Sequence, residues 1–303
     1  MITVNCVVVT YNRLALLKEN LQALKAQTFQ PQRIIIIDNC STDDTAGFLE
    51  TLKNDDQYLI IRTDKNIGGA GGFSLGLKTS VKYGCDFTWM MDDDTIPNAD
   101  ALERLVETTR QEKNVGFVCS RVNWTDGSQH TMNKPFLTHN DNFPTTSQVN
   151  HNINAVKCLT CSFVSVLIAS EAVRHVGLPI KEFFIWCDDI EYTQRISSAG
   201  FNCYYVAHSI VTHKTGSNYF PSIDKAPSNM AWRFYYQARN TCYIKRKKGK
   251  SKIVFLFSIL NKYRVYKHKL NRRTDGHKEE FLKEVKRGCI DGLRFNPQIE
   301  YVD

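Results

Sequence analysis

Three consecutive carboxylates, Asp92, Asp93 and Asp94, are the residues of this sequence best suited to chemistry. They follow residues 87–91, a short apolar and aromatic run that predicts a buried strand. Like charges side by side at the end of a strand repel one another unless a cation lies among them. Oxygen ligands favour Mg²⁺ or Mn²⁺, and both cations hold phosphates. The alternative is an acidic surface turn without a ligand.

A second acidic pair, Asp188 and Asp189, follows an aromatic run and begins a predicted helix. One carboxylate can cap that helix, which leaves the other free to act as a general base. Helix capping without catalysis is the alternative. Downstream, His213 ends the last predicted strand, where a neutral imidazole can complete an oxygen-rich Mn²⁺ site or serve a structural role.

Two further polar segments also follow predicted strands. Asp38 comes after four isoleucines, and its carboxylate can accept a hydrogen bond from a base or a ribose, or form a turn before the next helix. Residues 66–72 are rich in glycine, but they lack the spacing of a dinucleotide fingerprint and of a nucleotide-triphosphate loop. Glycines that allow close backbone approach next to a helix N-terminus suit a ligand's phosphates or sugar, and a structural turn is the alternative.

The elements that must position these residues alternate between strand and helix. The expected strands are residues 3–9, 33–37, 58–62, 87–91, 115–120 and 202–207, and the expected helices are residues 14–27, 45–53, 73–83, 99–113 and 188–198. This alternation predicts an α/β fold with a doubly wound, mostly parallel sheet, in which ligands bind beyond the carboxyl ends of the strands. Residues 158–168 form another apolar run, and residues 123–154 are predicted to be a long loop or hairpin insertion.

The length of 303 residues is enough for one large domain, expected over residues 1–240, with an extension over residues 241–303. The ten cysteines are scattered, and the first residues show no basic segment before a signal-peptide core. We therefore expect free thiols in a reducing cytoplasm. No apolar run approaches the roughly 20 residues that span a bilayer.

The C-terminal extension carries much of the net charge of +8. Lysine and arginine are dense over residues 245–252 and 262–273, with aromatic residues between them. Such a segment can be a solvated helical face, or it can bind nucleic acid or an anionic membrane surface. Because we find no nucleic-acid-binding motif, we expect no nucleic-acid partner and prefer the membrane surface.

Taken together, the motifs resemble those of the inverting family 2 glycosyltransferases of GT-A fold over roughly residues 2–240. The matching elements are Thr10-Tyr11-Asn12-Arg13, Asp38-Asn39-x-Ser41-x-Asp43, Asn66-x-Gly68-Gly69, Asp92-x-Asp94, Trp186-x-Asp188-Asp189-x-Glu191-Tyr192 and His213. The signature Arg233-x-x-Tyr236-x-x-Arg239-Asn240 further resembles the branch that contains galactofuranosyltransferases and rhamnosyltransferases. The fold implied is a Rossmann-like, mostly parallel sheet flanked by helices, with a basic helical C-terminal extension.

The resemblance implies metal-dependent transfer of a sugar, with inversion, from a nucleotide-sugar donor to a glycan or lipid-linked glycan acceptor in surface polysaccharide synthesis. It favours UDP-galactofuranose as the donor. The implied ligands of Mn²⁺ or Mg²⁺ are Asp92, Asp94 and His213. The implied donor-binding residues are Thr10, Arg13, Asp38, Asn66, Gly68, Gly69, Asp92 and Asp93. The implied acceptor-binding residues are Trp186, Tyr236, Arg239 and Asn240.

The resemblance further implies that Asp189 deprotonates the acceptor, while the inserted Cys187 keeps Asp188 as an alternative base. A dTDP-rhamnose-dependent rhamnosyltransferase and an inactive glycan-binding GT-A domain are the competing interpretations. An NAD-dependent oxidoreductase is disfavoured, because the fingerprint is missing and the acidic run would repel a pyrophosphate. We expect a cytoplasmic enzyme, peripheral at the inner face of the cell membrane, and leave its oligomeric state open.

Overall fold

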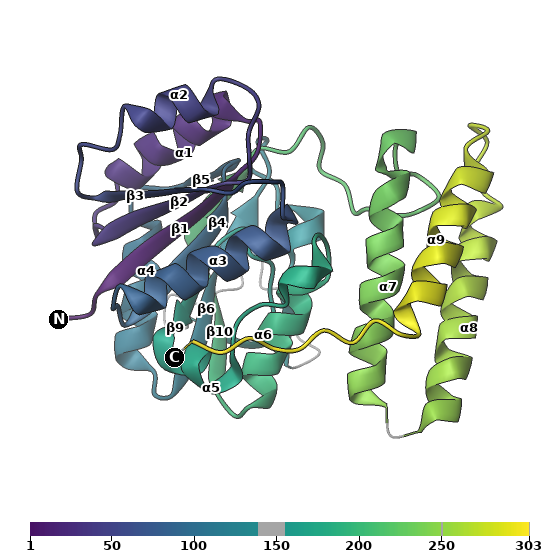
Figure 1. Cartoon of the computed structure of the whole chain (residues 1–303). Helices are drawn as coiled ribbons and strands as arrows, with labels where there is room; N and C mark the ends of the chain where they lie inside the picture. Colours follow the sequence, from purple (N-terminus) through teal and green to yellow (C-terminus); the bar gives the residue numbers. More distant parts are fainter. Residues whose placement is uncertain (139–154, 250, 303) are drawn as a thin grey trace.

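The computed structural model describes residues 1–138, 155–249 and 251–302, and within them a ten-stranded sheet lies between helices (Figure 1). The strands are β1 (Val4–Thr10), β2 (Arg33–Asp38), β3 (Tyr58–Arg62), β4 (Phe87–Asp92), β5 (Thr95–Pro97), β6 (Val115–Asn123), β7 (Phe136–Leu137), β8 (Val156–Thr160), β9 (Val166–Ala169) and β10 (Asn202–His213). Their order is β3-β2-β1-β4-β9-β6-β10-β8-β7, and β5 pairs with β10. The predicted α/β sheet is confirmed.

Strands β3, β2, β1 and β4 are parallel, and β10 is parallel to β6. Helices cover both faces: α1 (Leu14–Lys25), α2 (Thr45–Glu50), α3 (Gly68–Lys82), α4 (Ala101–Gln111), α5 (Ser170–Val176) and α6 (Asp188–Ser198). The alternation of side chains along β1 explains the two cores, because Val7 and Val9 pack with α3, whereas Cys6 and Val8 pack with α1 and α4. A strand covered on both faces reads as a continuous apolar run.

Several expected elements differ in extent from those observed; β10, for example, continues to His213 instead of ending at residue 207. Helix α3 begins at Gly68 instead of residue 73, so the glycine-rich stretch is its first turn. Glycine disfavours helix in isolation, but here Gly72 and Gly76 let the helix lie directly against Val9 and Val7 of β1. The apolar run 158–168 is divided between β8 and β9. Of the loop expected over residues 123–154, the structure shows a 3₁₀ turn, η1 (Thr131–Asn133), and β7, while residues 139–154 lie outside the described residues.

The C-terminal extension is a bundle of α7 (Ala231–Lys248), α8 (Lys252–Leu270) and α9 (Lys278–Gly292), which stands beside the sheet (Figure 1). Phe234, Phe281 and Val285 are buried between these helices. The predicted helical extension is confirmed. The division at residue 240 stays a prediction, and α7 runs across that position. Among the helices of the described residues, none combines the length and apolarity that a membrane crossing requires.

The last residues of the chain return to the sheet domain, as the yellow trace in Figure 1 shows. The backbone oxygen of Glu300 accepts a hydrogen bond of 2.7 Å from the Leu178 N–H. Its carboxylate forms ion pairs with Lys181, at 2.9 Å, and with Lys78. These two ammonium groups lower the pKa of Glu300 to about 2. The tail therefore fastens the bundle to the α3 side of the sheet.

Candidate active site

Adjacent parallel strands bring the first polar motifs to one edge of the sheet. In the strand register Thr10 lies opposite Asp38, and Val9 lies opposite Asp92. The Thr10 hydroxyl donates a 2.7 Å hydrogen bond to Asp93, while the Arg13 guanidinium binds Asp94 and approaches Asp93 at 3.4 Å. Thr10 and Arg13 thus hold the acidic run in place.

His213 reaches this run through the short ladder between β5 and β10. The ladder places His213 opposite Thr95, and the Lys214 N–H donates to the backbone oxygen of Asp94 at 2.8 Å. As a result, His213 Nε2 lies 3.1 Å from Asp94 Oδ1. One ligand atom from each of Asp92, Asp94 and His213 lies within 4.8 Å of the other two.

Asn133 fixes the tautomer of this histidine. Its amide nitrogen donates to the Ser162 hydroxyl at 3.0 Å, which assigns the amide oxygen to His213 Nδ1, also at 3.0 Å. Nδ1 therefore carries a proton, and Nε2 faces Asp94 Oδ1, a buried oxygen without a hydrogen-bond donor in the described part of the chain. Burial opposes a charge on this ring, but the Asp94 carboxylate outweighs it and raises the pKa of His213. Once Nε2 gives up its proton, its lone pair and the Asp94 oxygen converge and fit a cation, as do the ligand types.

The pKa shifts of the three carboxyl groups of residues 92–94 also favour a cation site. Burial raises the pKa of Asp93 to about 7, although the charge of Arg13 opposes the shift. Burial, followed by repulsion from Asp94, raises the pKa of Asp92 to about 6. Burial also acts on Asp94, but His213 and Arg13 together outweigh it and lower the pKa of that carboxyl. The run is short of positive charge, which a divalent cation would supply.

The second acidic pair is preceded by a loop in a strained conformation. Phe184, Trp186 and Cys187 have φ angles of 64°, 65° and 69°, a region that non-glycine residues rarely occupy. The buried Asn240 amide lies 2.9–3.2 Å from the carbonyl oxygens of residues 183, 185 and 186. The structure gives the Asn240 amide a positioning role on this loop, and the acceptor contact of Asn240 stays a prediction.

Gly68 makes room for the same loop. The oxygen of Phe184 accepts a hydrogen bond from the Ala70 N–H at 3.1 Å, and a Cβ on Gly68 would lie 2.2 Å from that oxygen. Gly68 also has a φ of +75°, and its N–H is capped by Asn66 Oδ1 at 2.8 Å. Close approach of the loop backbone therefore explains this glycine without a ligand.

Asp188 and Asp189 differ in their surroundings. Asp188 is buried, and burial and then repulsion from Asp189 raise its pKa well above the usual range. Asp189 is partly exposed and accepts a 2.7 Å hydrogen bond from the Ile190 N–H. Burial raises the pKa of Asp189 to about 6, and this hydrogen bond limits the rise. Near neutral pH, Asp189 is the carboxylate of the pair that is available as a base.

One cleft of about 1340 Å³ is lined both by Asp92 and Asp94 and by Asp188 and Asp189. The predicted site residues that line it are Arg13, Gly69, Asp92, Asp94, Trp186, Asp188, Asp189 and His213. The predicted site residues outside its lining are Thr10, Asp38, Asn66, Gly68, Asp93, Tyr236, Arg239 and Asn240. Tyr236 stacks on Phe184 at 4.9 Å, and Arg239 donates to the Glu182 carbonyl, so both brace the strained loop.

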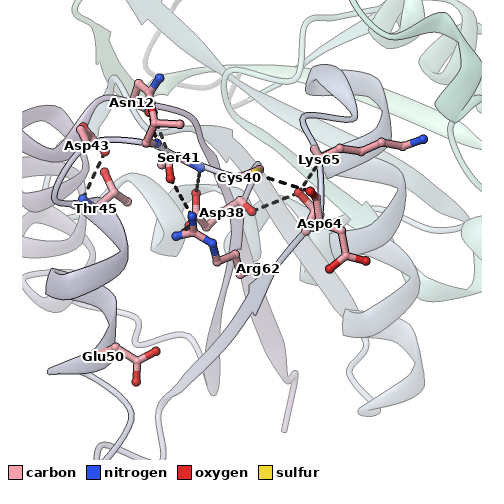
Figure 2. Close-up of polar contacts among 12 residues, drawn as sticks. Asn12, Asp38, Cys40, Ser41, Asp43, Thr45, Glu50, Arg62, Asp64 and Lys65 are labelled. Carbon is pink, nitrogen blue, oxygen red and sulfur yellow. Dashed lines mark hydrogen bonds and ion pairs between the residues drawn. The ribbon is translucent and has the colours of Figure 1, made fainter.

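Asp38 is outside the cleft lining and belongs to the polar network of Figure 2. Its carboxylate is buried and accepts hydrogen bonds from the Ser41 N–H, at 2.9 Å, and from Arg62, at 3.0 Å. Arg62 also donates to the Ser41 carbonyl at 2.7 Å, and so it joins the ends of β2 and β3. Sequence reasoning missed Arg62 and Asn133. Arg62 ends the strand next to Asp38, which was a usable signal, whereas Asn133 lies in a segment without periodicity.

The sequence over residues 6–171 matches the family described as Glycosyl transferase family 2. The galactofuranosyltransferase GlfT1 of Mycolicibacterium smegmatis is 25% identical over 262 residues, covering 82% of this chain and 84% of the relative. The O-antigen chain rhamnosyltransferase WbaN of Salmonella anatum is 30% identical over 224 residues, covering 71% and 66%. The structure of GalNAc-T7 with UDP, GalNAc and Mn²⁺ superposes with a TM-score of 0.58 at 14% identity, over 80% of this chain and 51% of that one.

The role of Asn133 predicts a loss of metal affinity when it is replaced. Asn133→Leu removes the acceptor for His213 Nδ1–H, so we expect Mn²⁺ to bind about 10- to 100-fold more weakly in a titration without donor. Asn218→Leu is the control, since Asn218 bonds the same turn at Thr131 without touching His213. Unchanged Mn²⁺ affinity in a folded Asn133→Leu protein would show that the histidine orientation does not depend on this amide.

Proposed function

The chain belongs to glycosyl transferase family 2, and we propose that it transfers galactofuranose from UDP-galactofuranose to a glycan acceptor with inversion at the anomeric carbon. It is a glycosyltransferase, and its fold is that of the GT-A glycosyltransferases, which confirms the resemblance in the motifs. The observation that carries the proposal is the single cleft that Asp92, Asp94 and His213 share with Asp188 and Asp189.

The donor side of the proposed reaction rests on the edge of the sheet. Asp92, Asp94 and His213 would hold Mn²⁺ or Mg²⁺, since their oxygen and imidazole atoms converge. Such a cation, when bound, neutralises the donor's diphosphate and so favours its departure. Arg13 lines the cleft next to Asp94 and is placed to meet the diphosphate. Asp38, braced by Arg62, would accept a hydrogen bond from the base or the ribose.

The acceptor side of the proposed reaction rests on Asp189. Its carboxylate removes the proton from the acceptor hydroxyl, whose oxygen forms a bond to the anomeric carbon while the bond from that carbon to the diphosphate breaks. One displacement inverts the configuration, and the nucleoside diphosphate leaves. Asp188 is buried, and its pKa is raised by burial and by Asp189, so it is neutral when Asp189 is charged.

The two competing functions are transfer of rhamnose and glycan binding without catalysis. The 30% identity to a rhamnosyltransferase favours a dTDP-rhamnose donor as the second candidate. The broader coverage of the galactofuranosyltransferase, 84% of that relative, is the reason for placing UDP-galactofuranose first. An inactive glycan-binding domain is disfavoured, because such a domain has no need for a base and a cation site in one cleft.

A donor panel tests the proposed function. With Mn²⁺ present, we expect hydrolysis and transfer with the highest kcat/KM for UDP-galactofuranose, compared with dTDP-rhamnose and UDP-galactopyranose. A chelator should abolish both activities, as should Asp94→Ala, which removes a predicted ligand. Preference for dTDP-rhamnose would replace the galactofuranosyl assignment, and full activity in chelator would remove the metal. Failure of every donor to react would count against transferase activity itself.

The assignment of Asp189 as the base predicts how kcat depends on pH and predicts that Asp189→Asn removes this dependence. Because Asp189 must be ionised, kcat should rise as the pH increases through about 6 and then level off. Repulsion from Asp92 contributes to that pKa, so a bound cation should move the rise to lower pH. Asp189→Asn should lower kcat by roughly 10²-fold or more, remove the rise and leave UDP affinity nearly unchanged. If Asp188→Asn shows this pattern and Asp189→Asn is mild, the two roles are exchanged.

The bundle offers a surface for membrane attachment, which would place the enzyme at the inner face of the cell membrane. Ile253, Val254, Leu256, Phe257 and Leu260 are all exposed on the first turns of α8, which we call the α8 apolar face. Exposed lysines stand at the end of α7, at positions 247 and 248, and at the start of α8, at position 252. Each contributes about 1 kcal/mol near an anionic surface, and the apolar side chains add shallow burial.

Vesicle co-sedimentation tests this attachment. The full chain should bind vesicles that contain anionic lipid at low salt and leave them at high salt. The double substitution Ile253→Ser with Phe257→Ser should reduce binding several-fold without changing donor hydrolysis. Tyr83→Ser, at a site 54% exposed on the sheet domain, is the matched control and should bind like the wild type. Equal sedimentation of the double variant and the wild type would exclude the α8 apolar face as the contact.

A further inference from the structure

Arg233 is a partly buried guanidinium that lines the cleft and has no assigned role. It lies in the first turn of α7, and its Nε is buried without a hydrogen bond among the described residues. Its electrostatic neighbours there are Tyr219 and Arg13, neither of which is a carboxylate. A guanidinium that is partly removed from water without an acceptor is costly unless a ligand supplies one.

Two tryptophans hold this guanidinium in position. Its central carbon lies 5.9 Å from the ring centre of Trp186 and 5.3 Å from that of Trp232, within the range of cation–π contacts. Trp186 belongs to the strained loop that the Asn240 amide fixes, two residues before Asp188. The charge of Arg233 is therefore held on a rigid wall of the cleft, next to the loop that carries the base.

The charges already in the cleft leave a donor diphosphate incompletely neutralised. The three ionised carboxylates of residues 92–94 carry three negative charges, which Arg13 and a divalent cation just cancel. A diphosphate that joins the two halves of a nucleotide sugar brings about two further negative charges. Arg13 and Arg233 both line this cleft. Burial lowers the pKa of Arg233, and repulsion from Arg13 adds to that shift. An anion between two such groups relieves their repulsion.

We propose that Arg233 binds the donor's diphosphate opposite Arg13 and stabilises the negative charge that develops on it as it leaves. The inference rests on the proposed function and adds a catalytic residue on the bundle side of the cleft. A guanidinium fits phosphate oxygens with two parallel N–H donors, which suits a charge that grows during bond breaking. Lys225, Lys269 and Arg272 line the same cleft but are exposed, and no aromatic ring contact fixes them in the described structure.

The test compares Arg233→Gln and Arg233→Lys with Arg264→Gln, which removes one exposed charge from α8 outside the cleft lining. Calorimetry measures binding of UDP or dTDP, whichever the wild type binds more tightly, and of the corresponding nucleoside. We expect Arg233→Gln to weaken nucleotide binding by about 10-fold or more, with Mn²⁺ or with chelator, and to leave nucleoside binding unchanged. Arg233→Lys, which keeps the charge but not the paired donors, should fall between, and Arg264→Gln should match the wild type.

Donor hydrolysis provides the second measurement, where we expect kcat to fall by about 10²-fold in Arg233→Gln. Unchanged nucleotide affinity in that variant, with or without a rise in the acceptor KM, overturns the inference while the wild type remains an active transferase. A weakened nucleoside affinity overturns it too, because the effect would then lie outside the diphosphate. A wild-type chain that neither binds nucleotide nor hydrolyses any donor overturns the proposed function and this inference with it.

Discussion

Repulsion among three carboxylates at the end of one buried strand is the constraint on which the rest of this site depends. The sheet core forces residues 92–94 into a region of low solvent access, where two of the carboxyl groups have raised pKa values. Thr10 and Arg13 come from the end of β1, and His213 comes from the end of β10. Each of the three satisfies part of that charge. One oxygen of Asp94, which Nε2 of the imidazole faces, is left without a hydrogen-bond donor among the described residues. The architecture thus defines a cation site by what its own residues cannot neutralise.

A second constraint is the strained backbone of the loop before Asp188, which the C-terminal bundle helps to hold in place. Three non-glycine residues with positive φ precede Asp188 and Asp189. Such a backbone conformation persists only where its surroundings enforce it. The enforcement comes from two sides: Asn240 on α7 binds three carbonyl oxygens of the loop, and Gly68 on α3 admits the Phe184 backbone. The orientation of Asp189 therefore depends on packing between the bundle and the sheet domain. The ion pairs of Glu300 hold these two parts together from the other end of the chain.

Strand ends were predictable from the sequence because a parallel sheet gathers its carboxyl ends at one edge, so Asp38 and Asp92 could be assigned to one site from their apolar runs alone. The direction in which a motif residue points was not predictable. Asn240 belongs to a recognisable signature, yet nothing in residue type tells whether an amide faces a sugar or a backbone. Glycine is equally ambiguous, because close approach of a ligand and close approach of the Phe184 carbonyl call for the same residue. Asn133 lies in an irregular segment, where contacts are set by tertiary structure and leave no period to detect.

The two carboxylates at the start of α6, Asp188 and Asp189, have different roles although they are neighbours in the sequence. Asp188 and Asp189 are neighbours at the start of α6, so both feel the favourable partial charge of the helix N-terminus. Consecutive residues on a helix point about 100° apart, and Asp189 is partly exposed whereas Asp188 is buried. Once Asp189 is charged, its field holds the proton on Asp188, because a second buried charge at this distance has no counter-ion. A neutral Asp188 beside an ionised Asp189 leaves a single charged base in the cleft that both residues line, which a single displacement requires.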